Sequence, residues 1–423
     1  MKKLNLHMKY DSYKDSGVEW IGEVPSHWEN PSFNFISNLQ QGLQIPYNNR
    51  FFEKGTGMHE YITTKSVHNP NDPKQYILNP KKSVICKKED ILYGRTGNTG
   101  EVVTNVEGVF HNNFFKIDFN KALLTSKYLI YQLINVKFKE NILLLAGTTT
   151  IPDLNHGDFN SMKCIIPPLL EQQQIVSFLD SKTALIDSLI EKTQRKIELL
   201  KEKRTALINE VVTKGLNPKV EMKDSGVEWI GEIPVHWEIT KMKYGVNHLS
   251  EKGKPEKSDI KISPENVESD TGVCFNLYSE HESEGMRFQS GDILLNKLRL
   301  YLKKILYTEY DGFSLGEMIV LRTNNKLNNK YFYQLLFSQG LIDLLDSQST
   351  GIKLPRVSPD VILNTEIIYP PLNEQQQIVE YLDEQTGLID NTISIEEKRI
   401  ELLKEYCQSL ISEVVTGKRK VVA

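Results

Sequence analysis

The feature that most constrains this chain is that it repeats itself. Lys14–Glu29 reads KDSGVEWIGEVPSHWE and Lys223–Glu238 reads KDSGVEWIGEIPVHWE, so 14 of 16 positions are identical. A second pair, Pro168–Gly215 and Pro371–Lys418, aligns without a gap at an offset of 203, and more than half of its positions match. Such an internal repeat indicates two similar structural units. A chain of 423 residues also exceeds what one ordinary core supports.

The blocks between the repeats, about residues 30–165 and 239–367, show little identity to each other. Repeated ends with different middles indicate one scaffold that carries two different specificities. We therefore expect two variable domains, each followed by a repeated helix. The expected order is domain 1–166, helix 167–216, domain 217–369 and helix 370–423.

The second repeat has the pattern of a long helix. Pro167-Pro168 and Pro370-Pro371 stand just before each start, where proline is tolerated. Apolar residues then follow with alternating spacings of four and three, which is typical of a coiled-coil seam. The seam residues are Ile186, Ile190, Ile197, Leu200, Leu207 and Val211 in the first copy, and Ile389, Ile393, Ile400, Leu403, Leu410 and Val414 in the second.

The seam is interrupted at the same two places in both copies, by Thr193 and Arg204 in the first and by Glu396 and Cys407 in the second. Polar seam residues often fix register and partner. We predict that the two helices pair with each other, antiparallel and about a pseudo-twofold axis. A helix of roughly 45 residues spans about 65 Å and would act as a spacer. The alternative is two unrelated amphipathic helices, each packed on its own domain.

The variable blocks have an α+β pattern, with short alternating strands and turns rich in Gly and Asn. We expect helices at 127–134 and 330–337. The expected strands are Lys82–Cys86, Asp90–Tyr93, Glu101–Thr104, Phe114–Asp118, Gly291–Leu295 and Met318–Arg322. The predicted fold class is therefore α+β, with two mixed, twisted-sheet domains and two long helices.

Composition and charge narrow the possible functions. Hydrophobic residues make up 39% and charged residues 25%, as in soluble globular proteins. The net charge of −4 argues mildly against an indiscriminate nucleic-acid binder. No apolar run is long enough for a membrane span or a signal peptide. The four cysteines lie far apart in the sequence, so we expect the reducing cytoplasm.

The sequence contains no recognisable catalytic motif. It lacks a phosphate-binding loop, a glycine-rich cofactor loop and paired histidine metal ligands. The residues before Pro167-Pro168 and Pro370-Pro371 are Ile166 and Tyr369, which do not fit an amino-methyltransferase motif. We therefore expect no catalytic residue, no cofactor and no metal in this chain.

The two repeats together resemble a known family, the specificity subunit of type I restriction–modification systems. The resemblance rests on GVEWIGEVPSHWE (Gly17–Glu29, again from Gly226), PPLLEQQQIVSFLD (Pro167–Asp180) and PPLNEQQQIVEYLD (Pro370–Asp383). Each motif alone is moderately specific. Both motifs, twice, in this order, are highly specific and cover essentially the whole chain.

The resemblance implies two target recognition domains, each reading one half of a split, asymmetric site on double-stranded DNA. It implies that the repeated helices form the spacer and that the subunit has no catalysis of its own. Two modification subunits with S-adenosylmethionine and restriction subunits with ATP and Mg are the expected partners, with no membrane. Competing readings are a duplicated coiled-coil protein scaffold without DNA reading, and a stand-alone enzyme.

Candidate DNA-binding residues in the first domain are the polar and cationic residues of its Gly-, Thr- and Asn-rich loops. Gln and Asn pair with adenine edges, Arg with guanine edges and Lys with phosphates. The alternative is that each is a turn or capping residue. The candidates are Gln40, Gln41, Arg50, Thr63, Thr64, Lys65, Arg95, Asn98, His111, Asn112, Asn113 and Thr149.

In the second domain, basic residues interleaved with a tyrosine suggest a strand that faces DNA. The alternative is an ordinary solvated strand edge. The candidates are Lys297, Arg299, Tyr301, Lys303 and Lys304, with Lys353 and Arg356 in the loop before the second helix.

The four tryptophans lie in the shared segments, so we expect them to pack on the scaffold and not to stack on bases. For Glu171–Gln174 and Glu374–Gln377 two readings stay open. They either contact a shared partner or simply begin the helices, where an acidic residue suits the helix dipole.

Overall fold

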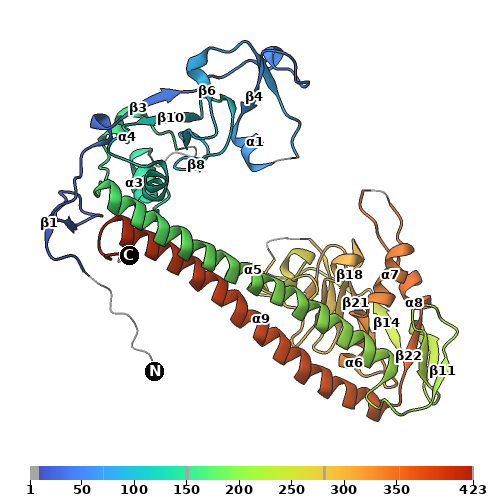
Figure 1. Ribbon diagram of the computed structural model, residues 1–423. Helices are drawn as coiled ribbons and strands as arrows, with labels where there is room; N and C mark the ends of the chain where they lie inside the picture. Colours follow the sequence, from blue (N-terminus) through green and yellow to red (C-terminus); the bar gives the residue numbers. More distant parts are fainter. Residues whose placement is uncertain (1–8, 70, 148–151, 280–282, 352, 422–423) are drawn as a thin grey trace. The chain divides into compact units, whose positions relative to one another are not determined.

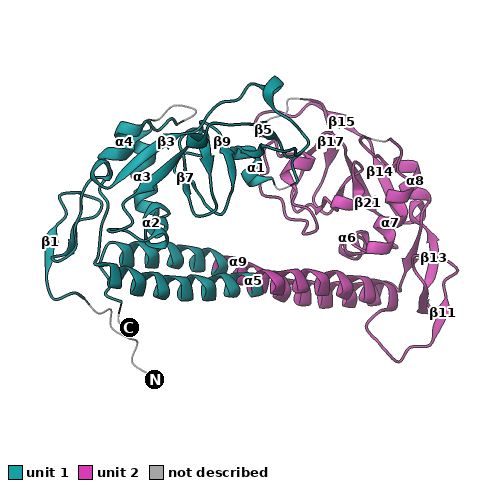
Figure 2. Ribbon diagram, turned by 45° about the horizontal axis from the view of Figure 1, so that its top comes forward, with its two compact units in different colours: residues 1–192, 399–423 teal, residues 193–398 magenta. Residues whose placement is uncertain are grey.

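The computed structural model describes residues 9–69, 71–147, 152–279, 283–351 and 353–421. The chain forms two compact units, coloured separately in Figure 2: unit 1 holds residues 1–192 and 399–423, and unit 2 holds residues 193–398. The helices α5 (Leu169–Lys214) and α9 (Leu372–Val415) are each shared between both units. The expected domain bounds were drawn at the helix ends instead, and they stay a prediction.

Unit 1 contains two four-stranded sheets (Figure 1). The first is antiparallel, in the order β3 (Ser37–Gln41), β10 (Phe114–Phe119), β7 (Ile91–Gly94), β8 (Val102–Val103). The second runs β5 (Tyr76–Leu78), β4 (Met58–Ile62), β9 (Gly108–Phe110), β6 (Ile85–Cys86), with β4 and β9 parallel.

Four short helices and a hairpin complete unit 1. The helices are α1 (Thr64–His68), α2 (Ser126–Leu133), α3 (Val136–Leu145) and α4 (His156–Ser161), and the hairpin joins β1 (Tyr13–Asp15) to β2 (Glu23–Pro25). The hairpin, α2, α3 and the nearer parts of α5 and α9 share one apolar core.

Unit 2 repeats this plan with different residues. Its antiparallel sheet runs β14 (Val246–Leu249), β21 (Met318–Thr323), β18 (Ile293–Asn296), β19 (Ile305–Tyr307). Its second sheet runs β15 (Lys252–Gly253), β17 (Gly285–Phe288), β20 (Gly312–Ser314), β16 (Lys261–Ile262), with β16 and β20 parallel. Both units thus place a parallel pair beside an antiparallel sheet.

The remaining helices and the hairpin of unit 2 have counterparts in unit 1. The strand pair at 238–241 and 366–369 corresponds there to isolated bridges, Glu29–Ile166 and Ser32–Lys163, and a 3₁₀ turn, Pro264–Asn266, stands in place of α1. The helices are α6 (Asn329–Leu336), α7 (Gln339–Ser347) and α8 (Pro359–Asn364), and the paired strands are β11 (Met222–Asp224) with β12 (Glu232–Pro234) and β13 (Glu238–Lys241) with β22 (Glu366–Tyr369). The α+β fold class with two long helices is confirmed.

The two long helices pack against each other within each unit. In unit 2, Lys196 Nζ lies 2.6 Å from Glu396 Oε1, and Arg204 Nε lies 3.0 Å from Asp390 Oδ1. Residue numbers rise on one helix as they fall on the other, so the pairing is antiparallel, as predicted. In unit 1, Ile186 of α5 shares the core with Leu410 and Val414 of α9.

All the predicted seam residues are buried or partly buried. The fully buried ones are Ile186, Ile197, Val211, Ile389, Ile393, Ile400, Leu410 and Val414, and the partly buried ones are Ile190, Leu200, Leu207 and Leu403. Their spacer role stays a prediction.

Two local expectations need correction. Lys82–Val84 forms a 3₁₀ turn, and only Ile85–Cys86 of that expected strand is extended. The segment from Lys297 to Lys304 is not a strand, because β18 ends at Asn296 and β19 begins at Ile305. Between them Leu300–Leu302 forms a 3₁₀ turn.

Candidate functional site

The repeated segments attach each variable domain to the helices. Trp28 is fully buried and donates its Nε1–H to Glu171 Oε2 at 3.0 Å, and His27 Nε2 lies 2.9 Å from the same oxygen. In unit 2, Trp237 donates to Glu374 Oε2 at 2.9 Å, and His236 Nε2 lies 2.7 Å from Oε1. These two tryptophans pack on the scaffold, as expected.

Buried glutamines make a second attachment. Gln172 accepts from Thr125 N at 2.9 Å and donates to Pro167 O at 2.8 Å. Gln375 accepts from Asn328 N at 2.7 Å and donates to Pro370 O at 2.8 Å. Glu171, Gln172 and their copies therefore serve internal contacts.

The far ends of the helices complete the attachment. The Tyr128 hydroxyl on α2 is shared between Ile165 O at 3.1 Å and Val415 O of α9 at 3.3 Å, and Tyr331 on α6 donates to Val212 O of α5 at 3.2 Å. Both tyrosine side chains are fully buried. The EVVT segments thus also pack inside the units.

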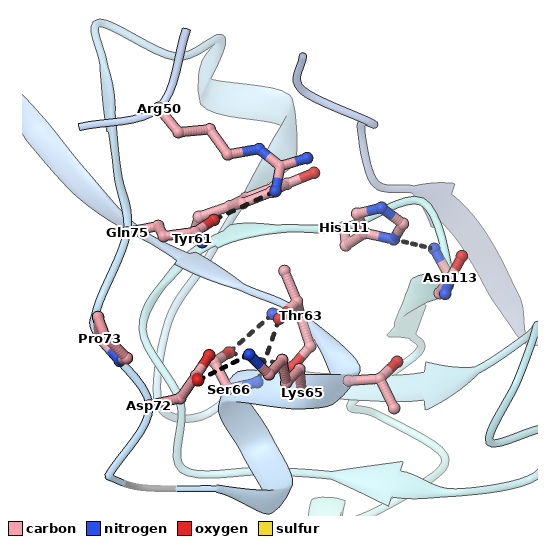
Figure 3. Close-up of a pocket in the computed structure, with 11 residues that line it drawn as sticks. Arg50, Tyr61, Thr63, Lys65, Ser66, Asp72, Pro73, Gln75, His111 and Asn113 are labelled. Carbon is pink, nitrogen blue, oxygen red and sulfur yellow. Dashed lines mark hydrogen bonds and ion pairs between the residues drawn. The ribbon is translucent and has the colours of Figure 1, made fainter. Parts of the chain in front are cut away.

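A cavity of about 330 Å³ opens beside the second sheet of unit 1 (Figure 3). Six of the predicted DNA-binding residues lie around it, although they come from three separate stretches of sequence. Its lining consists of Arg50, Tyr61, Thr63, Thr64, Lys65, Ser66, Asp72, Pro73, Gln75, His111 and Asn113.

Arg50 in this cavity is held by the protein itself. Its Nε donates to Ile45 O at 2.9 Å and its Nη1 to Gln75 Oε1 at 3.2 Å, while its Cζ lies 5.0 Å from the centroid of the Tyr61 ring. Tyr61 in turn donates to Leu43 O at 2.8 Å. Arg50 therefore shapes the loop that carries Ile45, and its guanidinium is mostly occupied.

The surroundings of His111 favour its neutral ring. Burial, with a further contribution from the Arg50 charge, lowers its pKa below the usual value. Its Nδ1 accepts a hydrogen bond from Asn113 N at 3.0 Å. A neutral imidazole offers one donor and one acceptor. It therefore suits a ligand group that both donates and accepts hydrogen bonds better than it suits a phosphate.

The turn after β4 presents the remaining polar groups. Thr63 and Ser66 form a capping box, in which Ser66 N donates to Thr63 Oγ1 at 3.1 Å and Thr63 N to Ser66 Oγ at 2.9 Å. Lys65 is exposed, and its Nζ lies 2.8 Å from Asp72 Oδ1. Thr64 Oγ1 is buried and has no partner among the described residues. An exposed cation thus stands at the cavity, and one buried hydroxyl oxygen in its lining has no partner among the described residues.

Other first-domain candidates lie outside the cavity lining. Arg95 donates to Leu154 O at 3.0 Å and pairs with Asp153 at 2.9 Å, so it fixes the loop before α4. Asn98 donates to Glu101 Oε2 at 3.1 Å. Gln40 and Gln41 end β3, Asn112 has a buried Oδ1 with no partner among the described residues, and Thr149 lies outside the described part of the chain.

The second-domain candidates do not form a DNA-facing strand. Lys303 is buried, its Nζ donates to Gln339 Oε1 at 2.6 Å, and burial lowers its pKa. Lys304 donates to Pro264 O at 2.6 Å. Lys297 and Arg356 both pair with Glu317, at 3.4 and 2.6 Å. Arg299, Tyr301 and Lys353 are exposed.

Tyr61, Ser66, Asp72 and Gln75 line the cavity but were not predicted. Thr63 was a usable signal, because a Thr three residues before a side chain that can accept a hydrogen bond fits a capping box, in which Ser66 here takes the place of the usual Glu or Gln. Asp72 and Gln75 reach the cavity through tertiary folding, for which the local sequence holds no signal.

The described residues hold no cluster of three or more His, Cys, Asp or Glu side chains placed to bind a metal. None of the helices in that part of the chain has the length and apolarity needed to cross a membrane.

The chain is 27% identical to the type I restriction enzyme MjaVIII specificity subunit of Methanocaldococcus jannaschii, over 94% of each chain. It is 22% identical to the EcoDI specificity subunit of Escherichia coli, over 64% of this chain and 65% of that one.

Solved structures share the fold. One, from a study of complex assembly and conformational transition of the type I R-M system, aligns with a TM-score of 0.67 at 14% identity, over 93% of this chain and 98% of the other. The HsdS subunit from Thermoanaerobacter tengcongensis aligns with a TM-score of 0.52 at 15% identity, with the same coverage. Residues 25–199 and 275–405 match the family described as the type I restriction modification DNA specificity domain, so the chain belongs to that family.

Proposed function

We propose that this chain is the sequence-specificity subunit of a type I restriction–modification enzyme, and that each variable domain binds one half of a split, asymmetric site on double-stranded DNA. The observation that carries the proposal is the duplicated frame. The attachments through Glu171 and Glu374 are the same, whereas the residues displayed by the domains differ. Such a frame suits two DNA-binding domains with different sequence preferences.

The residues around the cavity of unit 1 have the chemistry needed to bind one half of the DNA site. Lys65 supplies a mobile cation for a phosphate, which positions a protein on DNA. His111, Asn113 and Thr64 supply neutral donors and acceptors for base edges. Asp72 shields Lys65 in the free protein and would exchange its ion pair for the phosphate contact.

The proposed partners include two modification subunits, because each unit exposes a matched pair of leucines on the helices. Unit 1 exposes Leu185 and Leu402 to 56% and 53%, and unit 2 exposes Leu388 and Leu199 to 57% and 49%. The helix seam does not use these side chains. Exposed leucines at matching positions in both units suit two copies of one partner.

We expect the chemistry of the complex to reside on those partners. S-adenosylmethionine would bind the modification subunits, and ATP and Mg the restriction subunits, with the whole complex in the cytoplasm. The specificity chain would then be non-catalytic. Equilibrium dialysis of S-adenosylmethionine against the purified chain tests this, since binding by the chain alone contradicts it.

The decisive experiment maps adenine methylation across the genome in cells that carry the modification subunit with or without this chain. We expect one split motif with a fixed gap only when the chain is present. Replacing residues 30–165 with the block of another specificity subunit should change one half of that motif and leave the other.

The competing reading is a duplicated coiled-coil scaffold that does not read DNA. It predicts that no methylation motif depends on the chain and that the purified complex does not bind DNA. Those two results together would replace the proposal with the scaffold.

A further inference from the structure

Arg204 occupies a seam position of α5 where a coiled coil ordinarily places an apolar side chain. Its side chain is 14% exposed, and its Nε lies 3.0 Å from Asp390 Oδ1 on α9. Its Nη1 donates to Asp270 O at 3.2 Å, in a loop of the second variable domain. Its Cζ lies 5.9 Å from the ring centroid of Phe337, at the end of α6. One guanidinium thus joins both long helices to the domain.

The contacts continue through the domain and return to α5. Asp270 Oδ1 lies 3.9 Å from Lys303 Nζ, which donates to Gln339 Oε1 at 2.6 Å. Gln339 N then donates to Asn209 Oδ1 on α5 at 2.8 Å. We call Arg204, Asp270, Lys303, Gln339 and Asn209 the domain clamp.

The backbone around the clamp is also unusual. Asp270 and Lys303 have φ angles of 64° and 44°, in the left-handed region that side chains other than Gly rarely adopt. Such conformations persist only where surrounding contacts hold them. The clamp contributes to those contacts, because Asp270 and Lys303 each take part in two of its interactions.

Unit 1 does not repeat the clamp. At the offset of 203, Arg204 corresponds to Cys407 and Asn209 to Ser412, whereas Asp390 corresponds to Asp187 and is retained. Phe337 and Gln339 correspond to Ile134 and Val136. Cys407 packs against the apolar core of unit 1. The carboxylate is shared by both copies, but the arginine is a property of unit 2.

We propose that the domain clamp fixes the orientation of the second recognition domain on the helices, and that Arg204 is a positioning residue for the reading of its half-site. The inference rests on the proposed function. Hydrogen bonds and the planar guanidinium are directional, whereas apolar packing is not. Base readout needs donors and acceptors held to fractions of an ångström. A domain held by packing alone would read its bases less strictly.

The test replaces Arg204 by the residue found at its repeat position, R204C, in the full chain with its modification subunit. The matched control is R195C, because Arg195 lies on the same helix, is 60% exposed and pairs with Glu198 and Glu202 of that helix. We expect R204C to lose about tenfold in discrimination at positions of one half-motif only. R195C should keep the original motif.

A merely structural role has a different signature. General destabilisation lowers methylation at every site and leaves the preferred bases in both halves unchanged. That result, or an unaltered motif with R204C, overturns the inference. If the wild-type chain directs no split motif, the proposed function itself is wrong. If the wild-type chain directs one and R204C does not alter it, the inference about Arg204 alone is wrong.

Hydrogen exchange of the full chain gives a readout that does not depend on DNA. In R204C we expect faster exchange around Asp270 and at the amide of Gln339, which does not touch Arg204 in the clamp, and no change in unit 1. R204K keeps a charge for Asp390 but lacks the second arm toward Asp270 O, so it should lie between wild type and R204C. If R204C does not fold, R204K decides the matter: wild-type exchange in this variant overturns the inference.

Discussion

Units 1 and 2 share their frame but differ in how the variable domain is held and what it displays. Glu171 with Trp28 and Glu374 with Trp237 are the same attachment made twice. The clamp around Arg204 exists in unit 2, and Cys407 stands at that position in unit 1. Residues that are the same in both copies therefore attach each variable domain to the helices. Residues that differ between the copies, such as Arg204 and Cys407, change how firmly the domain is held.

The turn after the parallel strand shows the same division. In unit 1, Thr63 and Ser66 close a capping box after β4; in unit 2, Ser263 and Asn266 close one after β16. The residues inside the two boxes differ: Thr64-Lys65 in one and Pro264-Glu265 in the other. Both units have the same capping box, but the turn carries a positive Lys65 in unit 1 and a negative Glu265 in unit 2.

The largest expected effect tests whether the two attachments are equivalent. W28A and W237A each remove a fully buried indole and the hydrogen bond to its glutamate. We expect each to lower the free energy of unfolding of its own unit by about 3–5 kcal/mol. Urea unfolding followed by circular dichroism measures the loss, with the partly buried W20A as control. If only one of the two variants lowers the free energy of unfolding, the two attachments are not equivalent.

The next effect separates the two buried tyrosines. Y331F leaves the buried carbonyl of Val212 without its donor, and Y128F removes the hydroxyl that the carbonyls of Ile165 and Val415 share. We expect each to cost about 1–3 kcal/mol. Y128F should cost more, because the Tyr128 hydroxyl also accepts from Gln132 Nε2 at 2.9 Å. Equal thermal shifts for the two variants would contradict this ordering.

A third comparison concerns two lysines with the same predicted role. Lys65 is exposed beside the cavity, whereas Lys304 donates to Pro264 O inside unit 2. K65A should lower the slope of log affinity for DNA against log salt by about 0.9, the value for one phosphate contact. K304A should leave the slope unchanged. The reverse result, measured on the complex with its modification subunit, would move the interface to the Lys304 segment.

The smallest effect concerns acid stability. Burial acts to raise the pKa of Asp180, but hydrogen bonds from Lys127 and Tyr131 outweigh it and hold the pKa below the usual value. A carboxyl with a lowered folded pKa stabilises the protein above its unfolded pKa of about 4, and this is lost as pH falls through the folded value. Because the pair is largely exposed, D180N should cost under about 1 kcal/mol at pH 7. The difference from wild type should vanish on acidification, whereas a constant difference would assign it to packing.

The long helices were predictable because their signal is local and repeated. The expected segment Pro168–Gly215 is realised as Leu169–Lys214, since prolines mark its start and a seam with two interruptions follows from Ile186 to Val211. Strand β10 was predicted almost to its ends for a similar reason, because Phe114–Phe119 alternates and is bounded by turns. Periodic patterns determine such elements without tertiary help.

The basic segment before β19 was misread because its conformation depends on tertiary contacts. Arg299 and Lys303 adopt left-handed backbone that local sequence does not favour, and Lys303 is buried by its bond to Gln339. For the cavity, the residue types were a useful guide, but the local sequence was not sufficient. Six residues chosen for their chemistry meet there, but Asp72 and Gln75 join them only through the fold.

The sharing of α9 between the units has a consequence for synthesis. Unit 2 is one continuous stretch, residues 193–398, so all of its contacts are available once that stretch has left the ribosome. Unit 1 needs residues 399–423, and one partner of Tyr128 is the carbonyl of Val415. Domains ordinarily complete folding in the order of synthesis. Here the half of the protein that is translated first must wait, with part of its core uncovered, until the half translated later has finished.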